Sequence, residues 1–242
     1  FLMVDGPEDL WWLIGISGLM MLLHGAYITA ERAAMPNIVA DNELATANAL
    51  GSATWSTALA MGAFIGGIVV TEYGVEVAFI VDAVTFLVGA LILLPLAIPQ
   101  DVNEDMKGPL FSTAFSNIKR GLSRLISEPR LKRIVFAKTT WNLAGGGLAA
   151  VFLVLAGSRM TPGEIASGIG LFFMARGIGT GVGPIVARKY LTDEKKWPAL
   201  IGILVSTSGF FYLLIGLTLF ENLYLTIALV IIAHAASGAN WV

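Results

Sequence analysis

Residues Val77–Ile98 read VAFIVDAVTFLVGALILLPLAI and contain a single charged residue, Asp82. A run this long and this apolar predicts a helix that crosses a membrane, because a hydrocarbon core of roughly 30 Å needs about 20 apolar helical residues. Backbone groups in lipid must pair internally, and an uninterrupted apolar run fits a helix rather than the alternating pattern of a barrel strand. The stretch therefore predicts a membrane protein.

The rest of the chain has the same character. Its 242 residues are 56% hydrophobic and 13% charged, whereas an ordinary soluble domain carries about 25% charged residues. This composition excludes a soluble enzyme and a disordered chain, and it predicts an all-α, polytopic transmembrane helical bundle with about seven spans. The other six expected spans are Leu10–Ala30, Leu44–Val70, Ile134–Gly157, Glu164–Ala187, Trp197–Phe220 and Leu223–Val242.

Net charge and cysteine content exclude further classes of protein. The formal net charge is −2, which gives no signal of nucleic-acid binding. The sequence contains no cysteine, so it has no disulfide framework, no thiolate nucleophile and no cysteine-ligated metal. We expect no cofactor, no metal site and no catalytic constellation of nucleophile, base and orienting group, and hence no enzyme.

The basic residues gather on one side of the expected membrane. Segments 31–43, 99–133 and 188–196 hold 12 of the 15 lysines and arginines, and the segments on the opposite side hold only Arg159. The positive-inside rule places the basic side in the cytoplasm. We expect a multi-pass protein of the cell membrane, specifically a bacterial cytoplasmic membrane.

One long polar stretch, 99–133, divides the chain. It separates a first part, 1–98, with three spans from a last part, 134–242, with four. Apolar residues recur in it at helical spacing, at Phe111, Phe115, Ile118, Leu122 and Leu125. The predicted amphipathic helix either lies on the anionic inner leaflet or packs under the bundle as a strut.

The two ends of the sequence suggest a larger protein. Phe1 is not an initiator methionine, and Val242 follows the last apolar run without a polar flank. We expect this chain to be a middle piece of a longer one.

Several motifs, taken in order, resemble a known family. Residues 31–39, ERAAMPNIV, and 47–50, ANAL, resemble the region after the fourth helix of major facilitator superfamily exporters. Residues 62–67, GAFIGG, resemble the fifth-helix motif Gly-Pro-x-x-Gly-Gly, with Ala63 in place of the proline. Residues 82–87, DAVTFL, resemble the sixth helix, and residues 117–131 resemble the central loop. The branch is similar to the enterobactin-exporter-like and macrolide-efflux-like proteins.

This resemblance implies a fold and an activity. The family has twelve helices in two halves, and this chain would cover helices four to ten. It implies a monomeric secondary transporter that exports a small apolar or amphipathic molecule, drug-like or siderophore-like, by proton antiport and alternating access. The alternatives are a nutrient importer or uniporter of the same fold, and a non-transporting membrane scaffold or sensor derived from it.

Basic residues inside spans are the leading candidates for the substrate pathway. Arg176 lies near the middle of its span, where an arginine costs roughly 2.5–3.5 kcal/mol to insert. It is expected to bind an anionic substrate or to pair with a carboxylate, with Phe173 as a helical neighbour. Lys138 and Asn142 share a helix face and are expected to contact substrate or form a gate, although Lys138 would also reach the cytoplasmic surface.

Three titratable side chains are candidates for proton coupling. Asp82 is the one carboxylate well within a span, and His24 and His234 titrate nearest neutral pH. The alternative for each is a structural role in pairing or packing.

The first part of the chain supplies the remaining candidates. Glu31 and Arg32, at a cytoplasmic helix end, form either a gate or a solvated terminus. Ser52 and Trp55 share a helical stripe with Gly62 and Gly66, and either face substrate or pack. The expected packing motif for close helix approach consists of Gly62, Gly66 and Gly67.

Overall fold

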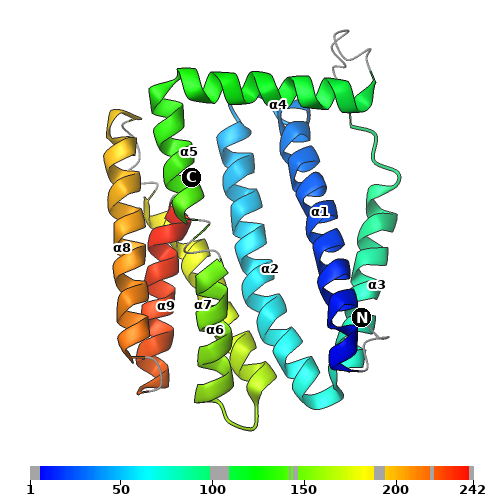
Figure 1. Ribbon diagram of the computed structural model, residues 1–242, viewed down its shortest axis with the longest axis vertical. Helices are drawn as coiled ribbons and strands as arrows, with labels where there is room; N and C mark the ends of the chain where they lie inside the picture. The colour runs from blue at the N-terminus through cyan, green and yellow to red at the C-terminus, as the bar shows by residue number, and fades with distance from the viewer. Residues whose placement is uncertain are drawn as a thin grey trace. The chain divides into compact units, whose positions relative to one another are not determined.

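The computed structural model describes residues 6–98, 109–141, 143, 147–187, 194–218 and 221–239. Within these ranges the chain is helical, with no strand. The nine α-helices described there, labelled in Figure 1, are α1 (Leu10–Ala34), α2 (Leu44–Tyr73), α3 (Val75–Leu93), α4 (Leu110–Ser127), α5 (Pro129–Trp141), α6 (Gly147–Met160), α7 (Ile165–Ala187), α8 (Trp197–Thr218) and α9 (Leu223–Gly238).

Most of these helices suit a membrane. Five helical segments are long and apolar enough to cross a membrane. They are Pro7–Asn37 (which contains α1), Thr46–Tyr73 (most of α2), α3, α7 and α8. Two shorter apolar helices are Leu148–Met160 and Leu223–Gly238. Their positions match the predicted apolar segments, because a span requires a continuous apolar run that hydropathy detects directly. The predicted amphipathic helix is also present, as α4.

The predicted span Ile134–Gly157 falls on two described helices, α5 from Pro129 to Trp141 and α6 from Gly147 to Met160. Between them, Leu143 is in a π-helical turn, and residues 142 and 144–146 lie outside the described residues. The continuity of this span therefore stays a prediction.

The chain forms two compact units. One contains Phe1–Gly51 and Ile68–Gln100, and the other contains Ser52–Gly67 and Asp101–Val242. In the first unit, no residue in the apolar windows of α1 and α3 is buried within the chain. Such surfaces require lipid or further helices to cover them.

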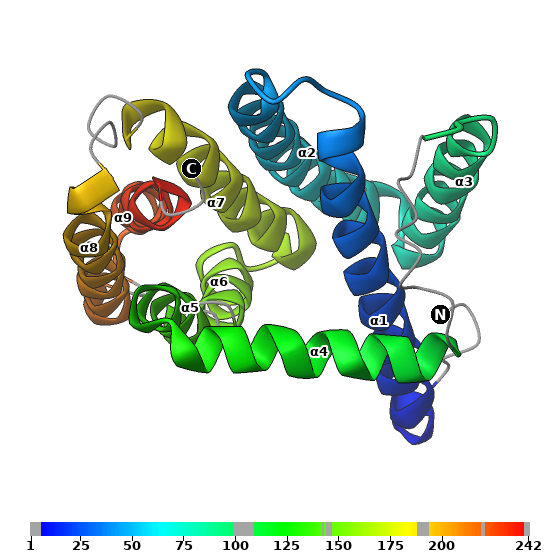
Figure 2. The ribbon, with the colours of Figure 1, turned by 90° about the horizontal axis from the view of Figure 1, so that it is seen from above.

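The core of the second unit lies among α6, α7, α8 and α9, which are side by side in both ribbon views (Figures 1 and 2). Leu153, Phe172 and Ile215 are almost completely buried there, together with Val230 and Ala233 of α9.

Glycines let these helices approach backbone to backbone. A Cβ added at Gly157 of α6 would lie 2.5 Å from the backbone nitrogen of Ile169 in α7. One added at Gly238 of α9 would lie 2.5 Å from the carbonyl oxygen of Thr180 in α7. Small residues at membrane-helix interfaces allow this approach, and they fix α7 between α6 and α9.

Candidate functional site

Arg176 lies within α7 and is half-buried in the second unit. Its guanidinium carbon is 5.8 Å from the centroid of the Phe173 ring, one helical turn earlier. This distance is within the range of a cation–π interaction, which is strongest where the cation is shielded from water. The predicted neighbours Arg176 and Phe173 are therefore in contact.

A second pair, Tyr212 and His234, joins α8 to α9. The Tyr212 hydroxyl and the Nε2 atom of His234 are hydrogen-bonded, and the rings meet edge to face with centroids 5.5 Å apart. His234 is only 1% exposed, and the backbone of α7 at Gly179 lies against its Cβ. Arg176 interacts electrostatically with both rings. We call these three side chains the polar cluster, Arg176–Tyr212–His234; the core around them is mostly apolar.

The charge of Arg176 has no carboxylate partner among the described residues. The acids of the second unit whose side chains are described are Glu128, Glu164 and Glu221. Each lies outside the apolar helices α6 to α9, at a helix junction or in a short loop. A cation at membrane depth needs a polar partner or water.

Two other pathway candidates lie on α2, in the part that belongs to the same unit. Ser52 is half-buried and Trp55 is 49% exposed. Lys138 lies in α5 but its side chain is not described, and Asn142 lies outside the described residues. The structure brings none of these four side chains into a described contact with Arg176.

The remaining titratable candidates lie in the first unit. His24 and Asp82 are exposed, and Glu31 and Arg32 are exposed near the end of α1. Among the three proton-coupling candidates, His234 alone is both buried and hydrogen-bonded to another side chain in the described part of the chain.

Of the three glycines in the expected packing motif on α2, only Gly67 has a close neighbour among the described residues. Added Cβ atoms at Gly62 and Gly66 meet no described atom within 4 Å, whereas one at Gly67 would lie 2.6 Å from the carbonyl oxygen of Ala166 in α7. The contact continues at Gly177 of α7, where an added Cβ would lie 2.6 Å from the backbone nitrogen of Ala60. The seam on α2 consists of Ser56, Ala60, Ala63 and Gly67.

The sequence interpretation missed Tyr212. Tyrosines in membrane helices gather at the interfaces with water, and Tyr212 is more than one turn inside both ends of α8. A tyrosine at that depth needs a hydrogen-bond partner, and this requirement is the signal that would have identified it.

The sequence as a whole matches the family model of the Major Facilitator Superfamily over residues 1–242. The chain belongs to this superfamily. Among curated proteins, it is similar to the uncharacterized MFS-type transporter YkuC of Bacillus subtilis strain 168, with 19% identity over 197 residues. That alignment covers 79% of this chain and 46% of YkuC, so the chain spans about half the length of this relative. No solved structure matches it significantly.

Membership confirms the predicted fold class, an all-α polytopic bundle of the major facilitator type. The apolar helices and the family together indicate a multi-pass membrane protein.

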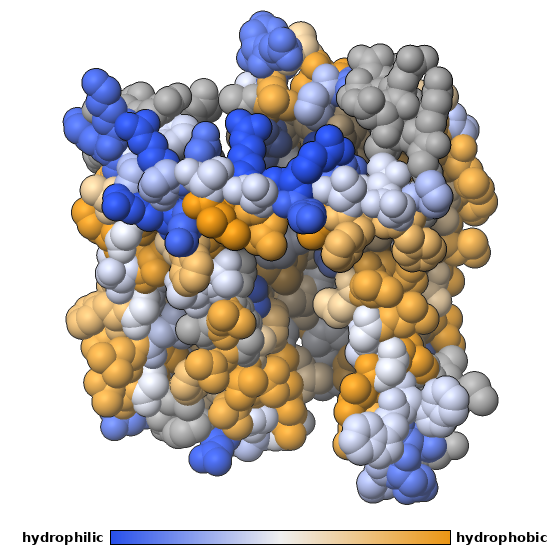
Figure 3. Space-filling view, turned by 45° about the horizontal axis from the view of Figure 1, so that its top comes forward, coloured by the Kyte–Doolittle hydropathy of each residue, from blue (hydrophilic) through white to orange (hydrophobic). Residues whose placement is uncertain are grey.

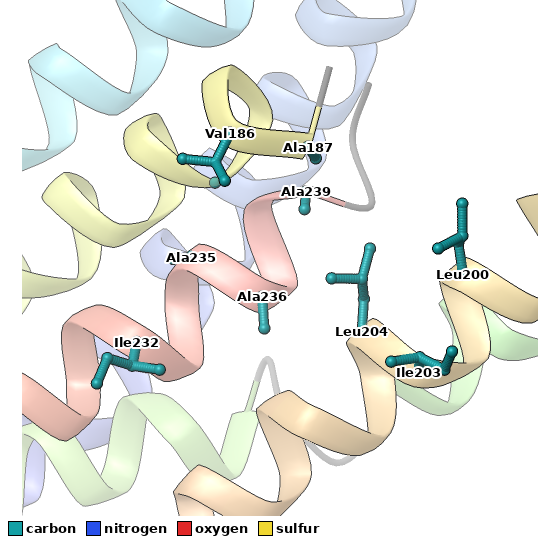
Figure 4. A pocket seen from close by; sticks show the side chains of 10 residues that line it. Val186, Ala187, Leu200, Ile203, Leu204, Ile232, Ala235, Ala236 and Ala239 are labelled. Atoms are coloured by element: carbon teal, nitrogen blue, oxygen red, sulfur yellow. The ribbon is translucent and has the colours of Figure 1, made fainter. Parts of the chain in front are cut away.

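The superfamily member also contains an apolar cavity, separate from the polar cluster. Its volume is about 340 Å³, and its lining comes from α7, α8 and α9 (Figure 4). The side chains around it are aliphatic or alanine, without a hydrogen-bonding group. Binding sites for small molecules combine apolar walls with a few polar groups that fix orientation. The cavity lacks such groups, so the polar cluster is the better candidate for substrate contact. The lining residues are Gly183, Val186, Ala187, Leu200, Ile203, Leu204, Ile232, Ala235, Ala236 and Ala239.

Proposed function

We propose that the full protein is a secondary active transporter that exports a small apolar or amphipathic molecule across the cell membrane by alternating access and proton antiport. Superfamily membership supports transport, and the motif resemblance supports the exporter branch. The observation that carries the proposal within this chain is Arg176, a half-buried cation in α7 without a described carboxylate partner.

In this proposal the polar cluster contacts the substrate. Arg176 holds a negative or electron-rich group, because a buried guanidinium offers five donors and no acceptor. Phe173 supplies an aromatic wall beside it. Ser52, Trp55, Lys138 and Asn142 remain pathway residues by proposal, as do Glu31 and Arg32 as a cytoplasmic gate.

Proton coupling is assigned first to His234. Its hydrogen bond to Tyr212 links its protonation to the contact between α8 and α9. A protonation event that favours one conformation shifts the balance between inward-facing and outward-facing states. Asp82 and His24 remain the alternative coupling groups, since both lie on apolar helices of the first unit.

The test is dye efflux from energised cells that express the full-length protein. Three amphipathic probes cover the charge classes: anilinonaphthalene sulfonate, Nile red and ethidium. Arg176→Ala should lower efflux of the transported probe at least about tenfold, since hydrogen bonds to charged groups contribute about 1.5–3 kcal/mol and 1.4 kcal/mol corresponds to tenfold. Arg176→Lys should restore part of the rate, because it keeps the charge.

Arg130→Ala is the matched control, because Arg130 is an exposed arginine at the start of α5. Its efflux should equal that of the wild type at equal membrane abundance. Export that persists after an uncoupler collapses the proton gradient would contradict proton antiport. Wild-type efflux from Arg176→Ala would remove Arg176 from the pathway.

A further inference from the structure

Helix α4 carries a stripe of large apolar side chains that nothing else described in the second unit covers. Phe111 is 88% exposed, and even the least exposed member of the stripe, Leu122, is 53% exposed. Their spacing of three and four residues places all of them on one face of the helix. A stripe this apolar requires a partner of its own. Its members are Phe111, Phe115, Ile118, Leu122 and Ile126.

The rest of α4 is basic and polar. Lys119, Arg120 and Arg124 are exposed, and the helix contains no aspartate or glutamate. At 100° per residue, Lys119 flanks the apolar stripe, and Arg120 and Arg124 lie on the far side. Figure 3 shows hydrophilic side chains in a band along α4, with hydrophobic ones beside it. This combination is typical of a helix that lies in the plane of an anionic lipid surface.

The connection to α5 holds α4 at the end of a membrane bundle. Glu128 alone separates the two helices, and its extended backbone, with φ −104° and ψ 104°, breaks the helical path. Figure 1 shows α4 leaving the end of α5 at a steep angle. Because α5 packs against α8, a candidate membrane span, α4 ends where that bundle meets the headgroup region.

The basic surface continues past this junction. Arg130, Lys132 and Arg133 are exposed in the first two turns of α5, and Glu128 is the one described acid between residues 109 and 141. Each lysine or arginine near an anionic surface strengthens binding about fivefold. The charge of the region therefore complements a layer of anionic phospholipid.

We propose that α4 lies in the interface of the adjacent leaflet and binds anionic phospholipid. Its apolar stripe enters the boundary between headgroups and acyl chains, and Lys119 at the flank of the stripe contacts lipid phosphates. Arg120 and Arg124 add positive charge within a Debye length of the anionic surface. This proposal concerns a lipid-binding surface and does not depend on the direction, substrate or ion of transport.

The absence of cysteine from the 242 residues allows site-specific labelling. Leu122→Cys places an environment-sensitive fluorophore on the apolar stripe, and Ser116→Cys is the matched position, because Ser116 is exposed and lies away from it. The full-length protein, with any other cysteine replaced, is reconstituted in vesicles of phosphatidylcholine with or without phosphatidylglycerol. Quenching is measured with spin-labelled lipid and with aqueous iodide.

The expected result is opposite quenching at the two positions. Spin-labelled lipid should quench the label at Leu122 and iodide should not, whereas iodide should quench the label at Ser116. A label at Leu122 that is shielded from both quenchers would show that the stripe packs against protein. One that iodide quenches would show a solvated helix. Either result overturns the proposal.

The role of charge is tested by Lys119→Gln/Arg120→Gln/Arg124→Gln. Phosphatidylglycerol should increase lipid quenching of the label at Leu122 in the wild type, and the triple variant should lose that increase. The control Lys195→Gln/Lys196→Gln removes charge from another segment and should retain the increase in lipid quenching. Equal quenching with and without phosphatidylglycerol in the wild type would overturn the assignment to anionic lipid.

Discussion

Gly183→Ala should destabilise the second unit, because α7 and α9 touch there through their backbones. An added methyl group at Gly183 would collide with the carbonyl oxygen of Ala235. It would also lie 2.8 Å from the Ala235 carbonyl carbon and 2.9 Å from the backbone nitrogen of Ala239, whereas ordinary contact begins at 3.4 Å. All three atoms belong to the backbone of α9, so no side-chain rotation relieves the overlap and the helices must separate.

The expected magnitude follows from two opposing effects. Overpacking costs about 1–3 kcal/mol, and a rigid backbone contact places Gly183→Ala at the upper end of that range. Replacing glycine by alanine inside a helix returns about 1 kcal/mol. The net loss is about 2 kcal/mol, which corresponds to a fall in Tm of about 4–8 °C for a chain of this size.

The assay is thermal unfolding of the detergent-solubilised full-length protein, followed by tryptophan fluorescence. Gly202→Ala is the matched control, because a Cβ at Gly202 of α8 meets no described atom within 4 Å. Its Tm should stay level or rise. If Gly183→Ala unfolds at the same temperature as Gly202→Ala, the close approach of α7 and α9 is not part of the folded protein.

Two further predictions use the same thermal assay. Tyr212→Phe should lower the free energy of unfolding by about 1–3 kcal/mol, because it leaves the buried His234 without its hydrogen-bond partner. Tyr224→Phe is the control, because Tyr224 is 82% exposed, and it should change the free energy of unfolding little. Equal losses of stability in the two variants would argue against a buried Tyr212–His234 pair. Gly67→Ala should lower Tm, since its methyl group meets the Ala166 carbonyl oxygen at 2.6 Å, while Gly66→Ala should not; the reverse order would place the opposite face of α2 against α7.

Hydropathy located most helices because the membrane imposes a length on each apolar run. The predicted segments Leu10–Ala30 and Glu164–Ala187 correspond to α1 and α7, with bounds that differ by a few residues. The predicted span Ile134–Gly157 covers parts of α5 and α6, and its continuity stays a prediction. The amphipathic helix α4 was predictable for the opposite reason, since its apolar residues occupy one face.

The face that each helix turns towards its neighbours was much harder to predict than the place of the helix in the sequence. Spans that are apolar all round carry little information about which side meets a neighbour. The packing motif on α2 was predicted as Gly62, Gly66 and Gly67, and of these only Gly67 meets α7 in the structure. One residue turns a helix by about 100°, so Gly66 and Gly67 face different neighbours. The contact between Tyr212 and His234 was missed because it depends on the rotation of two helices.

The contacts of α7 fix the rotation of this helix about its axis, and with it the side on which Arg176 projects. Gly168 of α7 meets α6, Gly177 meets the backbone of Ala60 in α2, and Gly179 meets α9. Because each of these contacts involves backbone atoms, rotation of α7 about its axis would replace a glycine by a side chain on at least one side. The helix is therefore held in one orientation, in which the charge of Arg176 acts on Tyr212 and His234. A conformational change that moves Arg176 must then carry α6 and α9 with it, which is the behaviour of a rigid bundle rather than of a single mobile helix.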